Sequence, residues 1–280
     1  MKKLFLIVLI SFTLLGGCTS KFAYNNIDWL LYWYMDDYIE VDKNQKRVFD
    51  KQLDSWLAWH RANELPKYKN HLLQIQSQLQ NGAIADEQWT AHFDFAVEHW
   101  YRLRDKLTPD LVATAGQLSE QQINALFEKL EEENVEREEK RAELSVAERI
   151  AENIEDLQDR IKDWIGHLSV EQKDIIAVKS AELESNFEDW MVYRRSIQDR
   201  AKILLLKRNE NVNFAKEFLD LINQPETYKS QSFVDRSERN KLVSADLLAQ
   251  ISGNLSAKQL KKLNKEIQAL IEDIDDLVNE

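Results

Sequence analysis

The sequence predicts an all-α protein, an irregular multi-helix array of helical hairpins with no sheet, and three observations support this fold class. The 280 residues contain only three prolines and six glycines, so few positions interrupt a helix. Apolar residues recur at steps of three and four, as in Ile150, Ile154, Leu157 and Ile161, and no segment shows the two-residue alternation of a strand. A glycine-led heptapeptide also recurs where one helix is expected to end and another to begin.

The N-terminus has the three parts of a secretory signal. Lys2 and Lys3 form a positive region, residues 4–15 form an apolar region too short to span a bilayer, and Gly16-Gly17 is a small-residue cleavage site. The stretch that ends at Cys18 resembles the lipobox of bacterial lipoproteins, in which the cysteine is acylated, for example with palmitate, and becomes the first mature residue. The alternative is an ordinary cleaved signal with an incidental cysteine.

The lipobox resemblance also implies a location. Residues 1–17 would be the signal peptide, and residues 18–280 would form a single periplasmic all-helical domain. Thr19 follows the cysteine where lipoproteins retained at the inner membrane commonly have Asp. The resemblance therefore implies a protein held by its lipid on the outer membrane and facing the periplasm.

Composition excludes several classes of partner. The formal net charge is −12, and removal of Lys2 and Lys3 with the signal takes it to −14. Such an acidic chain repels phosphate backbones and anionic headgroups, so nucleic acid is not an expected partner. Because Cys18 is the only cysteine, no disulfide is expected, and stability must come from packing.

The first expected helix of the mature chain, residues 22–38, is crowded with aromatic side chains. They are Phe22, Tyr24, Trp29, Tyr32, Trp33, Tyr34 and Tyr38. Because apolar groups occupy nearly every face, we favour a central helix buried by the others. The alternative is a helix that rests in the headgroup zone of the membrane, where Trp and Tyr are favoured, although Asp28, Asp36 and Asp37 oppose deep immersion.

The next helical segment begins at the capping box Asp42-x-x-Gln45 and has a break near Pro66. His60 and Glu64 lie four residues apart on one face, so they could exchange a proton or, as we favour, form an orienting hydrogen bond at a helix junction. No nucleophile or metal ligand is spaced with this pair. The sequence thus favours a structural role for this pair, with proton chemistry as the alternative.

The four heptapeptides mark corners between helices. They begin at all the glycines of the mature chain, Gly82, Gly116, Gly166 and Gly253. We expect each glycine to adopt the left-handed conformation that ends a helix, and Ser119, Ser169 or Ser256 to begin the next one in a capping box with the glutamine three residues on. In the first copy Ala85 occupies the cap position, so we expect Asp86 to cap instead. The spacings of 34, 50 and 87 residues are too irregular for a solenoid.

The remaining segments are assigned from the same signals. Residues 93–103 and 150–164 each have an apolar helical face that we expect to be buried. The chain from Ser119 to Ile165 is predicted to form two helices, with the charged stretch 131–143 as a solvated face or arm. Residues 224–237, which contain Pro225 and several serines, are predicted to form a loop. His92 and His99 share a helix face, but two histidines do not make a zinc site, so no metal or cofactor is expected.

Several stretches together resemble a known family. They are Tyr24-Asn25-x-x-Asp28-Trp29-Leu30, Trp33, Asp36-Asp37-Tyr38, Gln45, Phe49, Trp59-His60-Arg61-x-x-Glu64-Leu65-Pro66 and, more loosely, Trp164 to Gln172, Trp190, Arg194 and Gln198. This pattern resembles a family of proteobacterial lipoproteins known only as a domain of unknown function. The Leu-Ser-x-x-Gln corners also resemble the Leu-Thr-x-x-Gln motif of periplasmic helical stress proteins, some of which are chaperones.

The function these observations favour is a lipid-anchored periplasmic binding or adaptor module without catalysis, whose partner is another envelope protein or peptide. Trp and Arg dominate binding hot spots, so the candidate contact residues are Trp59, His60, Arg61, Glu64, Trp190 and Arg194. A periplasmic chaperone is the alternative. A cell-wall hydrolase that uses Glu64 with His60 is a third hypothesis.

Overall fold

The computed structural model describes residues 18–280, so the expected signal peptide at 1–17 lies outside the described residues. From residue 18 onward the chain is helical nearly throughout and has no strand, which confirms the all-α prediction. The elements are α2 (Cys18–Asn25), α3 (Ile27–Met35), α4 (Lys43–Asn63), α5 (Leu65–Gln80), α6 (Asp86–Ala115), α7 (Glu120–Ala142), α8 (Val146–Ile165), α9 (Val170–Glu182), α10 (Phe187–Leu206), α11 (Phe214–Asn223), the 3-10 helix η1 (Pro225–Tyr228), α12 (Gln231–Gly253) and α13 (Ala257–Asn279).

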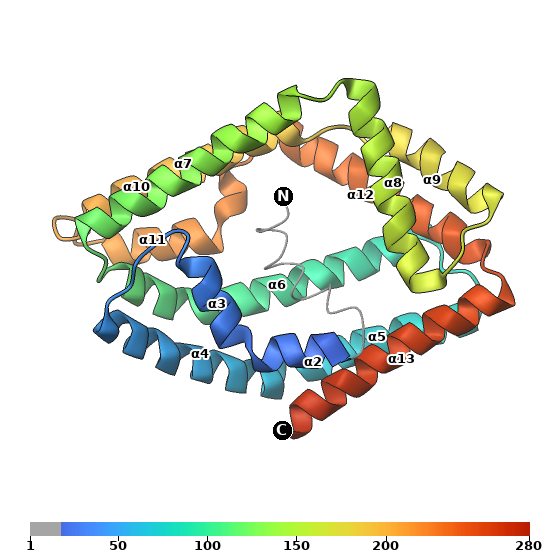
Figure 1. The fold of residues 1–280 in the computed structure, drawn as a ribbon, viewed down its shortest axis with the longest axis horizontal. Helices are drawn as coiled ribbons and strands as arrows, with labels where there is room; N and C mark the ends of the chain where they lie inside the picture. Colours follow the sequence, from blue (N-terminus) through green and yellow to red (C-terminus); the bar gives the residue numbers. More distant parts are fainter. Residues whose placement is uncertain (1–17) are drawn as a thin grey trace.

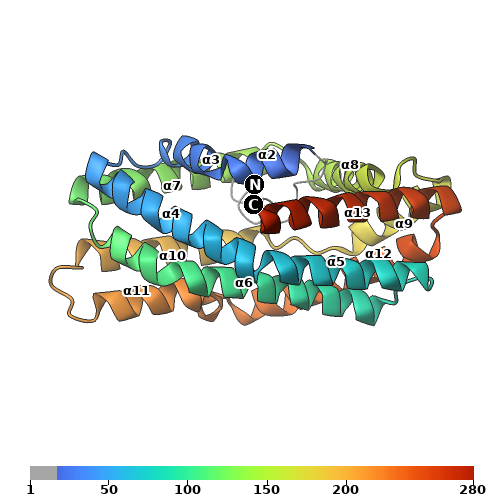
Figure 2. The same ribbon diagram turned by 90° about the horizontal axis from the view of Figure 1, so that it is seen from below.

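The helices form an elongated, flattened array (Figures 1 and 2). In Figure 1, α7 and α10 run along one long side, α4, α5 and α13 run along the other, and α6 lies between them. The helix α6 packs against α4, α11 and α12, so it links the two long sides. The helix α8 packs on α9 and α13 at one end of the molecule.

Serine caps and capping boxes begin the helices as predicted at three of the four corners. The hydroxyls of Ser119, Ser169 and Ser256 accept hydrogen bonds from the backbone N–H of the glutamine three residues later, at 3.1–3.3 Å. At the Gly82 corner Ala85 holds the cap position and has no side-chain oxygen to accept a bond. Only one of the two hydrogen bonds of a capping box therefore forms, from Ala85 N to Gln88 Oε1 at 3.1 Å. The expectation that Asp86 caps this helix is wrong, because Asp86 is already its first residue.

The capping glutamines also pair with one another across the fold. Gln122 Nε2 donates to Gln45 Oε1 (2.8 Å) and Gln45 Nε2 donates back (3.1 Å), which joins the starts of α4 and α7. Gln172 and Gln259 join α9 and α13 in the same way, at 3.2 and 2.8 Å. Both members of the second pair are buried, so each amide satisfies the other where water is excluded. The two pairs lie at opposite ends of the long axis (Figure 1).

These paired corners relate two halves of the fold, α4–α7 and α9–α13, which have a similar order of elements, except that α8 connects them and that α11 and η1 are inserted in the second half. Each half has a broken arm (α4–α5 or α9–α10), a long helix toward the middle (α6 or α12) and a last helix that starts at a serine-capped corner (α7 or α13). The second part of each arm packs on the last helix of the other half, α5 on α13 and α10 on α7. Each half thus completes the core of the other.

Several local predictions need correction. Positive φ occurs at Gly82 (133°) and Gly166 (86°), but not at Gly116 or Gly253. At Gly116, which has a helical φ of −62°, an added Cβ would make an ordinary van der Waals contact of 3.4 Å with the Phe214 ring, so packing does not require glycine there. The predicted loop at 224–237 is wrong: η1 occupies 225–228, and α12 begins at Gln231 after the Ser230 cap.

Two apolar helix faces were also misjudged. On α6, Val97 and Trp100 are exposed, and His92 and His99 are buried in their place. The favoured interpretation of residues 22–38 as a buried central helix is wrong as well, because α3 contains no buried residue. One side of α3 packs against the Phe49 cluster of α4, and its other side faces outward.

Candidate functional site

The most concentrated polar chemistry lies where α4 ends and α5 begins. Glu64, between the two helices, is fully buried, with 0% of its surface exposed. Its carboxylate accepts hydrogen bonds from Arg102 Nε (3.1 Å to each oxygen) and from Lys67 Nζ (2.5 Å). Burial opposes ionisation of Glu64, but the bonds from Lys67 and Arg102 outweigh it and hold the pKa of this carboxyl below its usual value.

His60 has partners other than Glu64. Its Nδ1 lies 3.0 Å from the Tyr24 hydroxyl of α2, and its Nε2 lies 3.3 Å from the Tyr68 hydroxyl of α5. Burial lowers the pKa of His60 to about 4, so the ring is neutral near pH 7. His60 lies at a helix junction, as predicted, but the predicted hydrogen bond between His60 and Glu64 is wrong, because the partners of His60 are tyrosine hydroxyls.

A row of adjacent histidine side chains extends from this junction along the interface between α5 and α6. The ring of Tyr68 meets His99 edge-on at 4.5 Å between centroids, and His99 lies 5.5 Å from His71. His71 Nε2 then lies 2.9 Å from His92 Nδ1, and burial lowers the pKa of His92 and His99 to about 4. Within residues 18–280, no group of three or more His, Cys, Asp or Glu side chains is placed to hold a metal ion.

Arg61 and Trp59 lie beside this junction but differ in their environment. Arg61 Nη2 donates to Asn25 Oδ1 (2.9 Å), lies 3.8 Å from Glu280 and stacks over the Tyr24 ring, so it ties α4 to α2 and to the C-terminus. Trp59 is half-buried on the same helix. The structure therefore brings Arg61, His60 and Glu64 together as a junction that holds helices.

Trp190 and Arg194 lie in a separate seam, between α7 and α10. Arg194 is 7% exposed; its Nε donates to Asn134 Oδ1 (2.6 Å), and its guanidinium lies 5.5 Å from the Trp190 ring. Glu133, which lies 3.5 Å from Arg194, also accepts a hydrogen bond from Tyr38. Glu64 and Arg194 were predicted as surface contacts, and this placement needs correction because both are buried.

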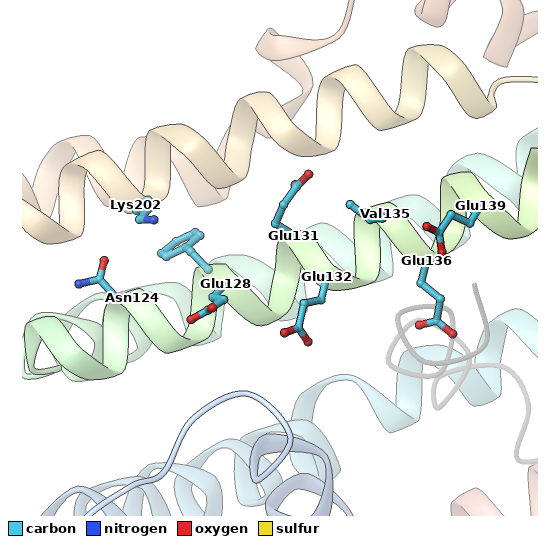
Figure 3. A pocket seen from close by; sticks show the side chains of 9 residues that line it. Asn124, Glu128, Glu131, Glu132, Val135, Glu136, Glu139 and Lys202 are labelled. Atoms are coloured by element: carbon cyan, nitrogen blue, oxygen red, sulfur yellow. The ribbon is translucent and has the colours of Figure 1, made fainter.

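The surface is hollowed along α7. A shallow groove of about 710 Å³ lies on this helix, and Figure 3 shows Glu131 directed toward α10 and Glu132 and Glu136 directed to the other side. The residues that line it are Asn124, Phe127, Glu128, Glu131, Glu132, Val135, Glu136, Glu139 and Lys202. The sequence identified the charged stretch 131–143, but it did not distinguish a groove from an evenly solvated face.

Sequence reasoning missed the groups that complete the buried junction. Arg102, Lys67 and His71 were not singled out. Arg102 and Lys67 neutralise the Glu64 carboxylate, and His71 continues the row of histidines. One signal was available: four of the five histidines fall between residues 60 and 99. The junction is a dense polar network inside a helical scaffold, although Arg61 Nε and His99 Nε2 are buried in it without a hydrogen-bond partner.

The comparisons with known proteins give a family. Residues 37–234 match a family of unknown function (DUF6279), and because this stretch covers more than half of the chain, the protein belongs to that family. The match includes α4 to α11, and so it contains both the Glu64 junction and the α7 groove. No curated protein and no solved structure matched the chain.

Proposed function

We propose that this protein is a lipid-anchored periplasmic envelope protein that binds another envelope protein or peptide without catalysis, with an acylated Cys18 holding it on the outer membrane. The single observation that carries the binding role is the groove along α7, where exposed glutamates flank the exposed Val135 and the largely buried Phe127. A segment with basic side chains beside apolar ones complements such a surface in charge and in shape.

The state of the buried junction supports a role without catalysis. The Glu64 carboxylate is fully buried and already saturated by Arg102 and Lys67, so a substrate could reach it only after the junction opens. His60 is held between two tyrosine hydroxyls. The hypothesis of a Glu64–His60 hydrolase therefore loses its geometric support.

The proposed location at the outer membrane rests on the N-terminal sequence, and the fold is compatible with it. No helix in residues 18–280 combines the length and apolarity needed to cross a bilayer. The helix α2 starts at Cys18 and is fastened to the C-terminus by Lys21, which contacts Asp276 (3.1 Å) and Glu280 (2.9 Å). A lipid on Cys18 would therefore hold the whole fold close to the membrane.

Photo-crosslinking in intact envelopes tests the binding role. A photoreactive residue at Glu132 should capture one specific protein or peptide. The variant with Glu128, Glu132 and Glu136 all changed to Gln should lower affinity for that partner roughly ten-fold, which corresponds to about 1.4 kcal/mol. The matched control changes Glu152 and Glu155 to Gln and Asp156 to Asn on α8, where these side chains are exposed, and should leave affinity unchanged.

Two outcomes would count against the proposal. Equal affinity in the α7 and α8 variants would show that the groove does not bind the captured partner. Capture of many unrelated unfolded proteins, together with suppressed aggregation in a light-scattering assay, would favour the chaperone alternative.

A further inference from the structure

The outward face of α2 and α3 carries the largest exposed aromatic side chains near the N-terminus. Phe22 is 69% exposed, Trp29 is 63% exposed and Trp33 is 54% exposed. The rings of Trp29 and Trp33 stack at 6.5 Å between centroids with 15° between their planes. Large exposed aromatic groups gathered on one face mark an interaction surface.

The opposite face of the same helices is fixed to the body of the protein. Leu31, Tyr32 and Met35 pack against the cluster of Phe49, Leu53 and Trp56 on α4. The Tyr32 hydroxyl also donates to Asp50 Oδ1 at 2.6 Å, and Tyr24 is buried beside Leu65. Because these contacts hold α3 in place, the outward aromatic side chains cannot turn inward without loss of this packing.

The position of this face relative to Cys18 indicates what covers it. Phe22 lies on α2, whereas Trp29 and Trp33 lie four residues apart on α3, one helical turn, and so share a face of that helix. Cys18 is the first residue of α2 and precedes Phe22 by four residues along the chain. At 1.5 Å per residue, Trp29 lies roughly 16 Å along the path from the expected lipid.

We propose that the Phe22–Trp29–Trp33 face docks on the bilayer that holds the lipid of Cys18, with its aromatic rings in the headgroup zone. This inference rests on the proposed lipid attachment. Tryptophan is enriched at that depth because its ring is apolar and its N–H is polar. A lipid so near would keep the face within reach of the membrane at all times, so modest apolar burial suffices to orient the molecule.

The charges around the face specify the kind of surface. Asp28 and Asp36 are exposed beside the aromatic side chains, and Lys21 is already paired with Asp276 and Glu280. Attraction to anionic lipids therefore contributes little, and carboxylates at the rim limit the depth of insertion. The face suits a zwitterionic headgroup layer, which the rings enter without a polybasic patch.

Quenching by brominated lipids tests the docking. The acylated protein, purified from envelopes, is reconstituted in phosphatidylcholine vesicles whose acyl chains are brominated. If Trp29 and Trp33 are the only two of the eight tryptophans that enter the bilayer, about a quarter of the emission should be quenched. The double variant Trp29→Phe/Trp33→Phe keeps apolar rings on the face but removes both tryptophans expected in the bilayer, so its quenching should be lost.

The matched control is Trp100→Phe, which removes an exposed tryptophan of α6 and should leave the quenched signal in place. In Figure 2, α2 and α3 lie along one edge of the molecule, and α6 lies toward the other. Quenching of the wild type no greater than that of lipid-free protein mixed with the same vesicles would overturn the docking. A signal that survives in the double variant would overturn it as well.

A second sample distinguishes failure of the docking from failure of the proposed lipid attachment. A thiol-reactive phospholipid is coupled to Cys18, the sole thiol, in the mature chain of residues 18–280. If the envelope protein carries no lipid, the anchor proposal fails, and this tethered protein still tests the face. If the envelope protein is acylated but neither sample is quenched, the anchor stands and the docking is wrong.

Discussion

At the scale of single residues, Glu64 shows how far a side chain's role depends on partners that are distant in sequence. The sequence placed it on a helix face with His60, and that spacing is correct. Its partner Arg102 lies 38 residues away, and the Tyr24 that binds His60 lies 36 residues away. Spacing along one helix cannot reveal such partners, so the residue types were identifiable and their bonding was not.

Glu64→Gln should destabilise the protein. The change leaves Arg102 and Lys67 without their counter-charge, although both side chains are about one-third to one-half exposed, so water replaces part of the loss. We expect the free energy of unfolding in urea to fall by about 1–3 kcal/mol. Glu98→Gln is the control: its carboxylate is exposed and 3.9 Å from the same arginine, and its cost should stay within about 0.5 kcal/mol. Equal costs would show that the buried pair is not stabilising.

Stability should fall on acidification. His60, His92 and His99 have an ordinary pKa of 6.5 and a pKa of about 4 in the fold because burial disfavours the charged ring. Between these pH values the unfolded chain binds more protons, so the free energy of unfolding decreases from about pH 6.5 down to about pH 4, by on the order of 1–3 kcal/mol per histidine. The lowered pKa of Glu64 adds a further loss at still lower pH.

Urea unfolding at pH 7 and pH 5 measures this effect. His92→Gln should flatten the dependence by removing one buried titrating ring. His167→Gln, at an exposed ring, should leave it unchanged. A free energy of unfolding that is the same at both pH values would contradict the account.

At the scale of elements, the corners show what local rules can and cannot predict. The serine caps were readable because a capping box is a short-range hydrogen-bond pattern. The left-handed glycine was correct only where the backbone turns sharply, at Gly82 and Gly166. At Gly116 the backbone is helical, and nothing in the structure requires glycine there. The Pro225 segment was predicted as a loop because Pro and Ser are typical of loops, yet Ser230 caps α12.

The contributions of Gln172 and Gln259 to stability should be coupled, because their side-chain amides bond to each other. Each single change to Ala leaves a buried amide unpaired and should cost about 1–3 kcal/mol, whereas the double change removes both and should cost less than the sum. A double-mutant cycle in urea should give a coupling of about 0.5–2 kcal/mol. Gln172→Ala combined with Gln122→Ala, at the other end of the molecule, should be additive. Additivity in the first cycle would mean that the amides only cap their own helices.

At the scale of the whole molecule, the sequence predicted the helical class and the corners but not their arrangement. Lys69 of α5 contacts Asp275 of α13 at 2.6 Å across 206 residues, as one contact of the α5–α13 packing that interleaves the two halves. Helical periodicity specifies which face of a helix is apolar, but it does not specify which distant helix covers that face.

The central claim is that this fold is tied to a membrane by a lipid on Cys18. Mass spectrometry of the N-terminal peptide from protein purified out of envelopes tests it most directly. The account predicts that the mature chain begins at Cys18 and that this residue carries acyl chains. A peptide that begins elsewhere, or that begins at Cys18 with a free thiol and no added mass, would contradict it.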